Sequence, residues 1–191
     1  PPPDSHAAAA PLGLDPAGTV HAQHDHHELS FVRKYIFSTD HKVIGIQYAV
    51  TAMLFLLFGF SLMMLMRWSL AFPGASLPVI GNLLGQTNAP GGIMLPEFYN
   101  QLGAMHGTIM VFMAIVPLAV GAFGNFVLPL QIGAVDMAFP KINMASVWAY
   151  FAGAAIMVAS FFIPGGPAKS GWTSYAPLSV IDSASAGQTF W

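Results

Sequence analysis

The sequence contains no cysteine and few charges: 7% of its 191 residues are Asp, Glu, Lys or Arg, whereas 55% are hydrophobic. Without cysteine the chain can form neither disulfides nor thiolate metal sites, so a bound metal would need histidine, methionine or carboxylate ligands. Soluble domains are about 25% charged, so this composition indicates an integral membrane protein. The net charge of -2 is too small to indicate nucleic acid as a partner.

Three long apolar segments predict an all-α membrane protein with transmembrane helices at about 43–67, 98–130 and 144–164. A helix needs about 20 apolar residues to cross a bilayer, and each segment provides them. The second segment is longer than one crossing requires, and we expect Pro117 to kink it. Arg67 and Trp68 form an interface pair that is expected to end the first helix. The four prolines in the stretch from 69 to 96 predict a loop there.

Residues 1–30 lack periodic apolar positions and are rich in His, Pro and Ala, which predicts a flexible tail. The run "HAQHDHHE" contains histidines at a spacing that can bind copper or nickel. A solvated tail without metal is the favoured interpretation. These histidines are His21, His24, His26 and His27.

The distribution of cations predicts the orientation in the membrane, because cytoplasmic flanks are enriched in Lys and Arg. One side of the predicted topology has four cations and the other has two. The four are Arg33, Lys34, Lys42 and Lys141, and the two are Arg67 and Lys169. We therefore expect a multi-pass protein whose N-terminus, including the tail, is cytoplasmic.

A single histidine, His106, lies within the second predicted span. An ionisable residue in a membrane span is a functional hypothesis by default, and Gly103 and Gly107 beside it leave room for a close partner. Met105, Ile109, Met110 and Met113 lie on or near its face. A neutral imidazole in such an apolar pocket suits haem iron. The alternative, a histidine that only packs against a neighbouring helix, stays open.

The other polar residues also have two interpretations each. Arg67 is either an interface anchor or a donor to a ligand near His106. Asp136 is either a turn carboxylate or the mouth of a proton pathway that Asn125, Asn143 and Ser146 line; Asn125 would lie about three helical turns before Asp136 if the helix persists. Aromatic residues Trp172 and Tyr175 belong either to an aromatic belt or to a lid over a cofactor pocket.

Four strings together resemble the catalytic subunit, subunit I, of the haem-copper terminal oxidases of the cytochrome c oxidase type. The strings are "STDHKVIGIQY" (38–48), "MHGTIMVF" (105–112), "GNFVLPLQIGAVDMAFPKIN" (124–143) and "GGPAKSGWTSYAPLS" (165–179). They follow the order and spacing of that family. The resemblance implies that residues 31–191 are the N-terminal part of a bundle of about twelve helices.

The resemblance also implies a role for each matching residue. His106 corresponds to an axial ligand of the low-spin haem a iron, and Arg67 to the arginine that hydrogen-bonds the formyl group of that haem. Trp172 and Tyr175 correspond to the loop near the haem propionates. The D proton pathway begins at the residue that corresponds to Asp136. The other residues that correspond to this pathway or its entrance are Asn125, Asn143, Ser146, His41 and Tyr48.

Two departures from the family stand out. The family often has two consecutive asparagines where this chain has Asn143 and Met144, so one amide of the pathway is missing. The ligands of the high-spin haem and of copper B, which the family implies, fall outside this segment, so no catalytic residue is expected within it. The chain thus resembles a piece of a longer subunit.

The function expected from the resemblance is that of a proton-pumping cytochrome c oxidase, in which electrons from cytochrome c reduce oxygen to water. The expected partners are the remainder of subunit I, oxidase subunits II and III, cytochrome c and the lipid bilayer, and the expected location is the bacterial plasma membrane. A quinol oxidase of the same superfamily and a non-catalytic membrane assembly subunit remain as alternatives.

Overall fold

The computed structural model describes residues 30–163 and 165–182. The chain divides into two units, Pro1–Ile36 and Phe37–Trp191, and each is described by itself. The described part of the first unit contains one π-helical turn, η1 (Val32–Ile36). Residues 1–29 of the predicted tail, with all four of its clustered histidines, lie outside the described residues.

The described residues of the second unit form helices and connecting loops, without strands. Three helices are long and apolar enough to cross a membrane: His41–Ala71, Pro96–Ile132 and Pro140–Phe162, whose 18-residue apolar windows have mean hydropathies of 2.3, 2.2 and 1.7. They confirm the predicted all-α membrane fold. The elements are α1 (His41–Ala71), α2 (Gly85–Asn88), η2 (Pro90–Gly92), α3 (Pro96–Thr108), η3 (Ile109–Ile115), η4 (Pro117–Gly124), α4 (Asn125–Ile132), α5 (Pro140–Ala159), η5 (Ser160–Phe162) and η6 (Leu178–Asp182).

The first membrane helix, α1, is longer than the expected 43–67. Asp40 caps its start, because the Asp40 side chain accepts a hydrogen bond of 2.8 Å from the backbone N–H of Lys42. At its other end α1 continues to Ala71 and stops just before Pro73, whose ring disfavours a helical residue in front of it. Arg67 therefore lies within the last turns of α1 and does not end the helix.

The second membrane helix runs from α3 to α4 and changes its winding on the way. Pro96 begins it at the first helical turn, and Gly133, with a left-handed φ of 70°, ends it. Between these ends, η3 and η4 are wider π-helical segments on either side of Val116. Pro117 has no N–H to donate and disturbs the regular ladder at this point, where a kink was expected. At this point the structure has two π-helical segments, η3 and η4, one on each side of Val116.

The third membrane helix begins at Pro140, before the expected start at residue 144. Proline favours the first helical position because its fixed φ suits a helix and its missing N–H is not needed there. Lys141 and Asn143 therefore belong to the first turn of α5. Between the first two spans, the expected loop of 69–96 contains the end of α1 and the short helices α2 and η2.

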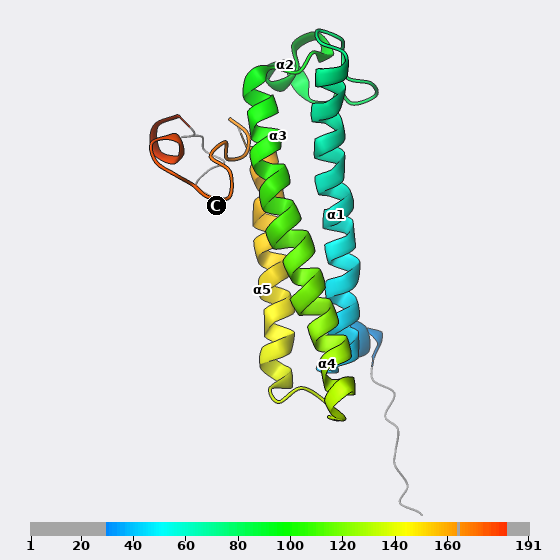
Figure 1. Ribbon diagram of the computed structural model, residues 1–191. Helices are drawn as coiled ribbons and strands as arrows, with labels where there is room; N and C mark the ends of the chain where they lie inside the picture. The colour runs from blue at the N-terminus through cyan, green and yellow to red at the C-terminus, as the bar shows by residue number, and fades with distance from the viewer. Residues whose placement is uncertain (1–29, 164, 183–191) are drawn as a thin grey trace, which may run out of the picture. The chain divides into compact units, whose positions relative to one another are not determined.

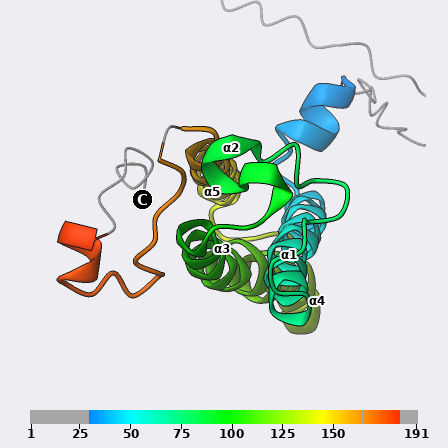
Figure 2. The ribbon, with the colours of Figure 1, turned by 90° about the horizontal axis from the view of Figure 1, so that it is seen from above.

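The second membrane helix packs along α1 in the antiparallel direction (Figure 1; Figure 2 shows the same helices from above). A Cβ placed on Gly45 would lie 3.1 Å from the backbone oxygen of Ala122, and one placed on Gly59 would lie 2.7 Å from Sδ of Met110. These glycines let the two helices approach closely. Helix α5 also contacts α1.

Two apolar clusters fill the space between the three helices, one toward each end. The larger cluster contains Leu62, Phe98, Leu102, Met105, Ile109 and Met157, and the smaller contains Ile44, Tyr48, Ala122 and Val147. Burial of these side chains fixes the register of the helices, which positions the polar residues described next.

Candidate functional site

The histidine of the second span, His106, lies in α3 and faces α1. Its Nδ1 is 2.8 Å from the backbone carbonyl oxygen of Gly59. Because a carbonyl can only accept, Nδ1 carries the proton and donates it, and Nε2 keeps its lone pair for another partner. The side chain is half-buried. A hydrogen bond from one ring nitrogen to a carbonyl is the arrangement that orients a metal-binding imidazole.

The glycines beside His106 face side chains. A Cβ on Gly103 would lie 3.3 Å from Cε of Met66, and one on Gly107 would lie 3.7 Å from Cδ1 of Trp172. The close approach to α1 thus takes place at Gly59, whose carbonyl receives the hydrogen bond of His106. That partner is a backbone atom of another helix, so no side-chain pattern in the sequence pointed to it.

Arg67 lies in the same half of the second unit as His106 but does not contact it. Gly59 marks the level of His106 on α1, and residue 67 is two helical turns further, about 12 Å at 1.5 Å per residue. The Arg67 side chain is exposed and, within the described part of the chain, makes no hydrogen bond or ion pair. Its guanidinium is therefore available to a ligand.

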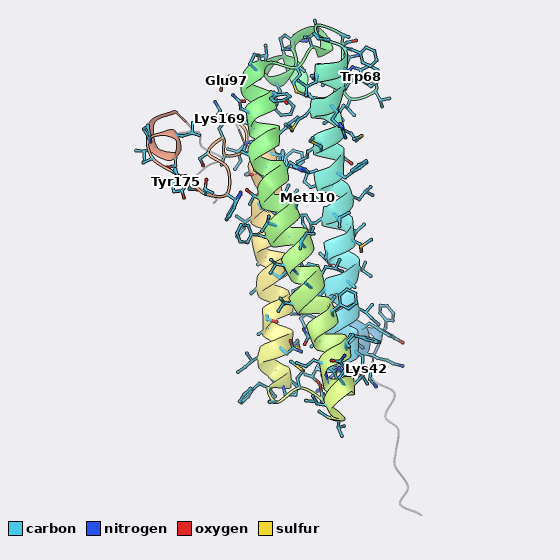
Figure 3. All side chains as sticks on the ribbon, in the orientation of Figure 1. Lys42, Trp68, Glu97, Met110, Lys169 and Tyr175 are labelled. Carbon is cyan, nitrogen blue, oxygen red and sulfur yellow. The ribbon has the colours of Figure 1, made fainter. Side chains whose placement is uncertain are left out.

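Residues 165–172, which we call the strap, lie along α3. The buried Gln101 donates a hydrogen bond of 2.7 Å from Nε2 to the carbonyl oxygen of Gly165. Nearer the start of α3, Lys169 forms an ion pair of 2.6 Å with Glu97; Figure 3 labels this pair. Together the two contacts hold the strap on α3. Neither contact was predicted from the sequence.

The two aromatic candidates beyond α5 have different surroundings. Trp172, at the end of the strap, packs its ring 6.0 Å from the ring of Phe112 and lies next to Gly107, the neighbour of His106. Tyr175 is 77% exposed. The structure thus brings Trp172 close to the helix that carries His106, and it leaves Tyr175 on the surface of the described part of the chain.

At the other end of the second unit, an open groove of about 540 Å3 is lined in part by polar side chains from all three membrane helices. Tyr48 of α1 donates a hydrogen bond of 3.0 Å to Oγ of Ser146, which in turn donates one of 2.6 Å to the carbonyl of Asn143. The polar side chains that line the groove are Tyr48, Asn125, Asn143, Ser146 and Tyr150. Four of these five were predicted from the sequence to share one path, and Tyr150 was missed.

Two buried amide atoms in this groove have no hydrogen-bond partner: Oδ1 of Asn125 and Nδ2 of Asn143. The other end of the Asn125 amide is held, because Nδ2 donates a bond of 2.7 Å to the carbonyl of Gly121. A buried acceptor and a buried donor without partners cost free energy unless water satisfies them. Both atoms therefore need a partner beyond the described side chains, and ordered water is the usual one for such buried amides.

Asp136 lies beside this groove, in the turn that follows α4. The condition of a persistent helix from Asn125 to Asp136 is not met, since α4 ends at Ile132. The Asp136 carboxylate accepts a hydrogen bond of 2.7 Å from the backbone N–H of Met137, which itself lines the groove. Asp136 is half-buried, so it caps its turn and keeps one oxygen for other contacts.

His41, at the start of α1, is 1% exposed and has its Nδ1 2.8 Å from the carbonyl oxygen of Asn125. It joins the start of α1 to the groove. The two groups of polar residues therefore lie at opposite ends of the second unit: Lys42, beside His41, is labelled at one end in Figure 3, and Trp68 and Glu97 are labelled at the other.

The site near His106 fits one axial bond to a haem iron. Among the described residues, no group of three His, Cys, Asp or Glu side chains could hold a metal ion. His106 instead offers one nitrogen, with its orientation fixed by Gly59. A single imidazole ligand is what a haem requires from one helix.

Comparison with known proteins shows the family of the chain. The family model described as Cytochrome C and Quinol oxidase polypeptide I matches residues 43–191. The chain is 43% identical over 157 residues to the "Cytochrome c oxidase subunit 1" of Thermostichus vulcanus, covering 82% of this chain and 25% of that protein. It is 42% identical over 157 residues to the "Cytochrome c oxidase subunit 1" of Synechocystis sp., with the same two shares, 82% and 25%.

A third relative has a different printed name. The "Alternative cytochrome c oxidase subunit 1" of Bradyrhizobium diazoefficiens is 39% identical over 163 residues, which is 85% of this chain and 25% of that protein. The chain thus spans about a quarter of the length of the curated relatives that it matches.

Proposed function

The chain belongs to the family of cytochrome c and quinol oxidase polypeptide I, and we propose that it is the N-terminal portion of the catalytic subunit of a proton-pumping cytochrome c oxidase. The observation that carries this proposal is the hydrogen bond of 2.8 Å between Nδ1 of His106 and the carbonyl of Gly59. It leaves Nε2 of a membrane-buried imidazole free to bind a haem iron. The names of the relatives support cytochrome c as the electron donor.

In this proposal the half of the second unit that contains His106 holds the low-spin haem a. His106 would hold the haem iron through Nε2, and the Arg67 guanidinium, unpaired among the described residues, would donate to the formyl group of the haem. Trp172 and Tyr175 belong to the loop near the propionates. When bound, the haem would supply one-electron redox chemistry, and the ligands of the high-spin haem and copper B would belong to the remainder of the subunit.

The opposite end holds the intake of the D pathway. Asp136 takes up protons from the cytoplasm, and His41 and Tyr48 lie near the entrance. The groove then orders water against the unpaired amide atoms of Asn125 and Asn143. A chain of hydrogen-bonded water and hydroxyl groups can move a proton, so Ser146 and the groove water carry it inward.

The proposed location is a bacterial plasma membrane, with the N-terminus on the cytoplasmic side. This orientation places Arg33, Lys34, Lys42 and Lys141 on the cytoplasmic flanks. It also places the Asp136 end toward the cytoplasm and the His106 end toward the outside. The proposed partners are the remainder of subunit I, oxidase subunits II and III, cytochrome c and the lipid bilayer.

The choice of electron donor tests the proposed activity. The complete oxidase that contains this chain is purified and its oxygen consumption is measured with reduced cytochrome c, with a reduced quinol, and with neither. We expect turnover with cytochrome c alone. Turnover with the quinol instead would identify a quinol oxidase, and a purified complex without oxygen consumption from either donor would support a non-catalytic assembly subunit.

A further inference from the structure

The backbone carbonyl of Met113 lies in η3, one turn before Pro117. Pro117 has no N–H and disturbs the backbone ladder there, and in the π-helical winding of this stretch a carbonyl pairs with the N–H five residues later, which for Met113 is Leu118. The hydroxyl of Tyr150 in α5 donates a hydrogen bond of 2.7 Å to this carbonyl. Tyr150 thus joins α5 to the second helix where its winding changes.

The ring of Tyr150 also lines the open groove that contains Tyr48, Asn125, Asn143 and Ser146. Tyr150 is part of the wall of the groove, and its ring centre lies 5.3 Å from that of Tyr48. On its far side it contacts Phe55 of α1, with a ring separation of 6.4 Å. Tyr150 therefore lies between the groove and Phe55, which packs against the larger apolar cluster.

Tyr48 has little freedom in this arrangement. Its ring lies against Gly121 so closely that a Cβ there would be 2.6 Å from two ring atoms. Its hydroxyl reaches Ser146 across the groove at 3.0 Å. The ring of Tyr150 packs against the Tyr48 ring. A shift of Tyr150 would therefore change the direction of the Tyr48 hydroxyl.

We propose that Tyr150 is a positioning residue of the proton pathway. Its hydroxyl anchors α5 to the Met113 carbonyl, one turn before Pro117, and its ring holds Tyr48 in the orientation that links α1 to Ser146. This inference rests on the proposed function, since it assigns Tyr150 to the groove that is proposed to conduct protons. It adds a residue that acts through its neighbours and takes up no proton itself.

The test uses Tyr150→Phe in the complete oxidase, because this change keeps the ring and removes only the hydroxyl. Proton uptake from the cytoplasmic side is measured during a single turnover, beside the rate at which the low-spin haem is reduced. We expect proton uptake to slow about fivefold, the factor that corresponds to one typical hydrogen bond, while haem reduction and haem content stay unchanged. Tyr99→Phe is the control, since the Tyr99 hydroxyl makes no hydrogen bond among the described residues.

A spectroscopic signature separates positioning from general loosening of the structure. The oxidase is labelled with carbonyl-13C methionine, and infrared spectra of the parent and Tyr150→Phe are subtracted. We expect one methionine carbonyl to shift to higher frequency, because it loses a hydrogen bond.

Asp136→Asn, measured in parallel, separates failure of this inference from failure of the pathway. If Asp136→Asn slows proton uptake and Tyr150→Phe neither slows it nor shifts a methionine carbonyl, the pathway stands and the role of Tyr150 is wrong. If neither variant slows uptake, both are wrong. If only Tyr150→Phe slows uptake and the carbonyl shifts, Tyr150 positions a groove that another residue feeds, and Asp136 is not the intake.

Discussion

At the scale of single residues, two histidines in the membrane helices make the same type of hydrogen bond, yet we propose different roles for them. His41 and His106 each have Nδ1 2.8 Å from a backbone carbonyl of a neighbouring helix. His41 is 1% exposed, whereas His106 is half-buried and therefore has an open side. The surroundings of each imidazole, more than its residue type, decide whether it can bind a cofactor.

Gly121→Ala tests the packing of Tyr48 at this scale. The added methyl group would lie 2.6 Å from two atoms of the Tyr48 ring, so the ring must move and the contact with Ser146 is lost. We expect a loss of stability of about 1–3 kcal/mol, typical of overpacking, and slower proton uptake. Both are measured on the complete oxidase, by thermal unfolding and by single-turnover proton uptake.

Gly124→Ala is the matched control, because a Cβ at Gly124 would meet nothing within 4 Å. Alanine is favoured over glycine inside a helix by about 0.5–1 kcal/mol, so this variant should be at least as stable as the parent. Equal behaviour of the two variants would show that Tyr48 does not pack against Gly121.

Much of the candidate site could be predicted from the sequence at this scale, and the reason is chemical. His106, Asp136 and Asn125 are polar residues in or next to apolar spans, where polar groups are costly and therefore conspicuous. Gly59 and Met113 could not be found in this way, because they contribute backbone carbonyls. Tyr150 was missed because an aromatic residue in a membrane helix resembles ordinary packing.

At the scale of elements, the winding of the second membrane helix was the least predictable feature. An apolar run shows only that a helix can cross the bilayer, and it has no strong periodicity that would distinguish α-helical from π-helical turns. Pro117 marked the place of the disturbance, and η3 and η4 extend it to both sides. Helix starts at Pro96 and Pro140 were predictable in principle from the preference of proline for the first turn.

The strap provides a prediction at this scale. Gln101→Leu removes the donor that satisfies the Gly165 carbonyl at 2.7 Å, so the strap should loosen from α3. Gly165 is exposed, so the lost hydrogen bond should cost about 0.5–1.5 kcal/mol. Hydrogen exchange of the complete oxidase should become faster at residues 165–172.

Gln131→Leu, an equivalent change on the exposed end of α4, should leave this exchange unchanged. The ion pair of Lys169 with Glu97 cannot compensate, because exposed pairs contribute only about 0.2–1 kcal/mol. Unchanged protection of the strap in Gln101→Leu would contradict its attachment through this amide.

At the scale of the whole molecule, composition alone predicted the class, since an apolar chain with so few charges must place its helices in a membrane. It could not predict the register between helices. That register follows from close contacts such as Gly45 against Ala122, which depend on shape. Much of each span's surface is exposed in the chain alone: in the most apolar window of each span, 17%, 28% and 22% of the residues are buried. In the proposed oxidase, the remainder of the subunit and lipid cover these faces.

The central claim, that His106 binds the low-spin haem, is tested most directly by a reduced-minus-oxidised absorption spectrum of the complete oxidase. The spectrum is recorded for the parent, for His106→Leu and for His41→Leu, which removes an imidazole with the same hydrogen bond at the other end of the second unit. We predict that His106→Leu loses the low-spin haem band while the high-spin signal survives, and that His41→Leu keeps both. An unchanged spectrum in His106→Leu would show that His106 only packs against α1, and would contradict the proposed haem site.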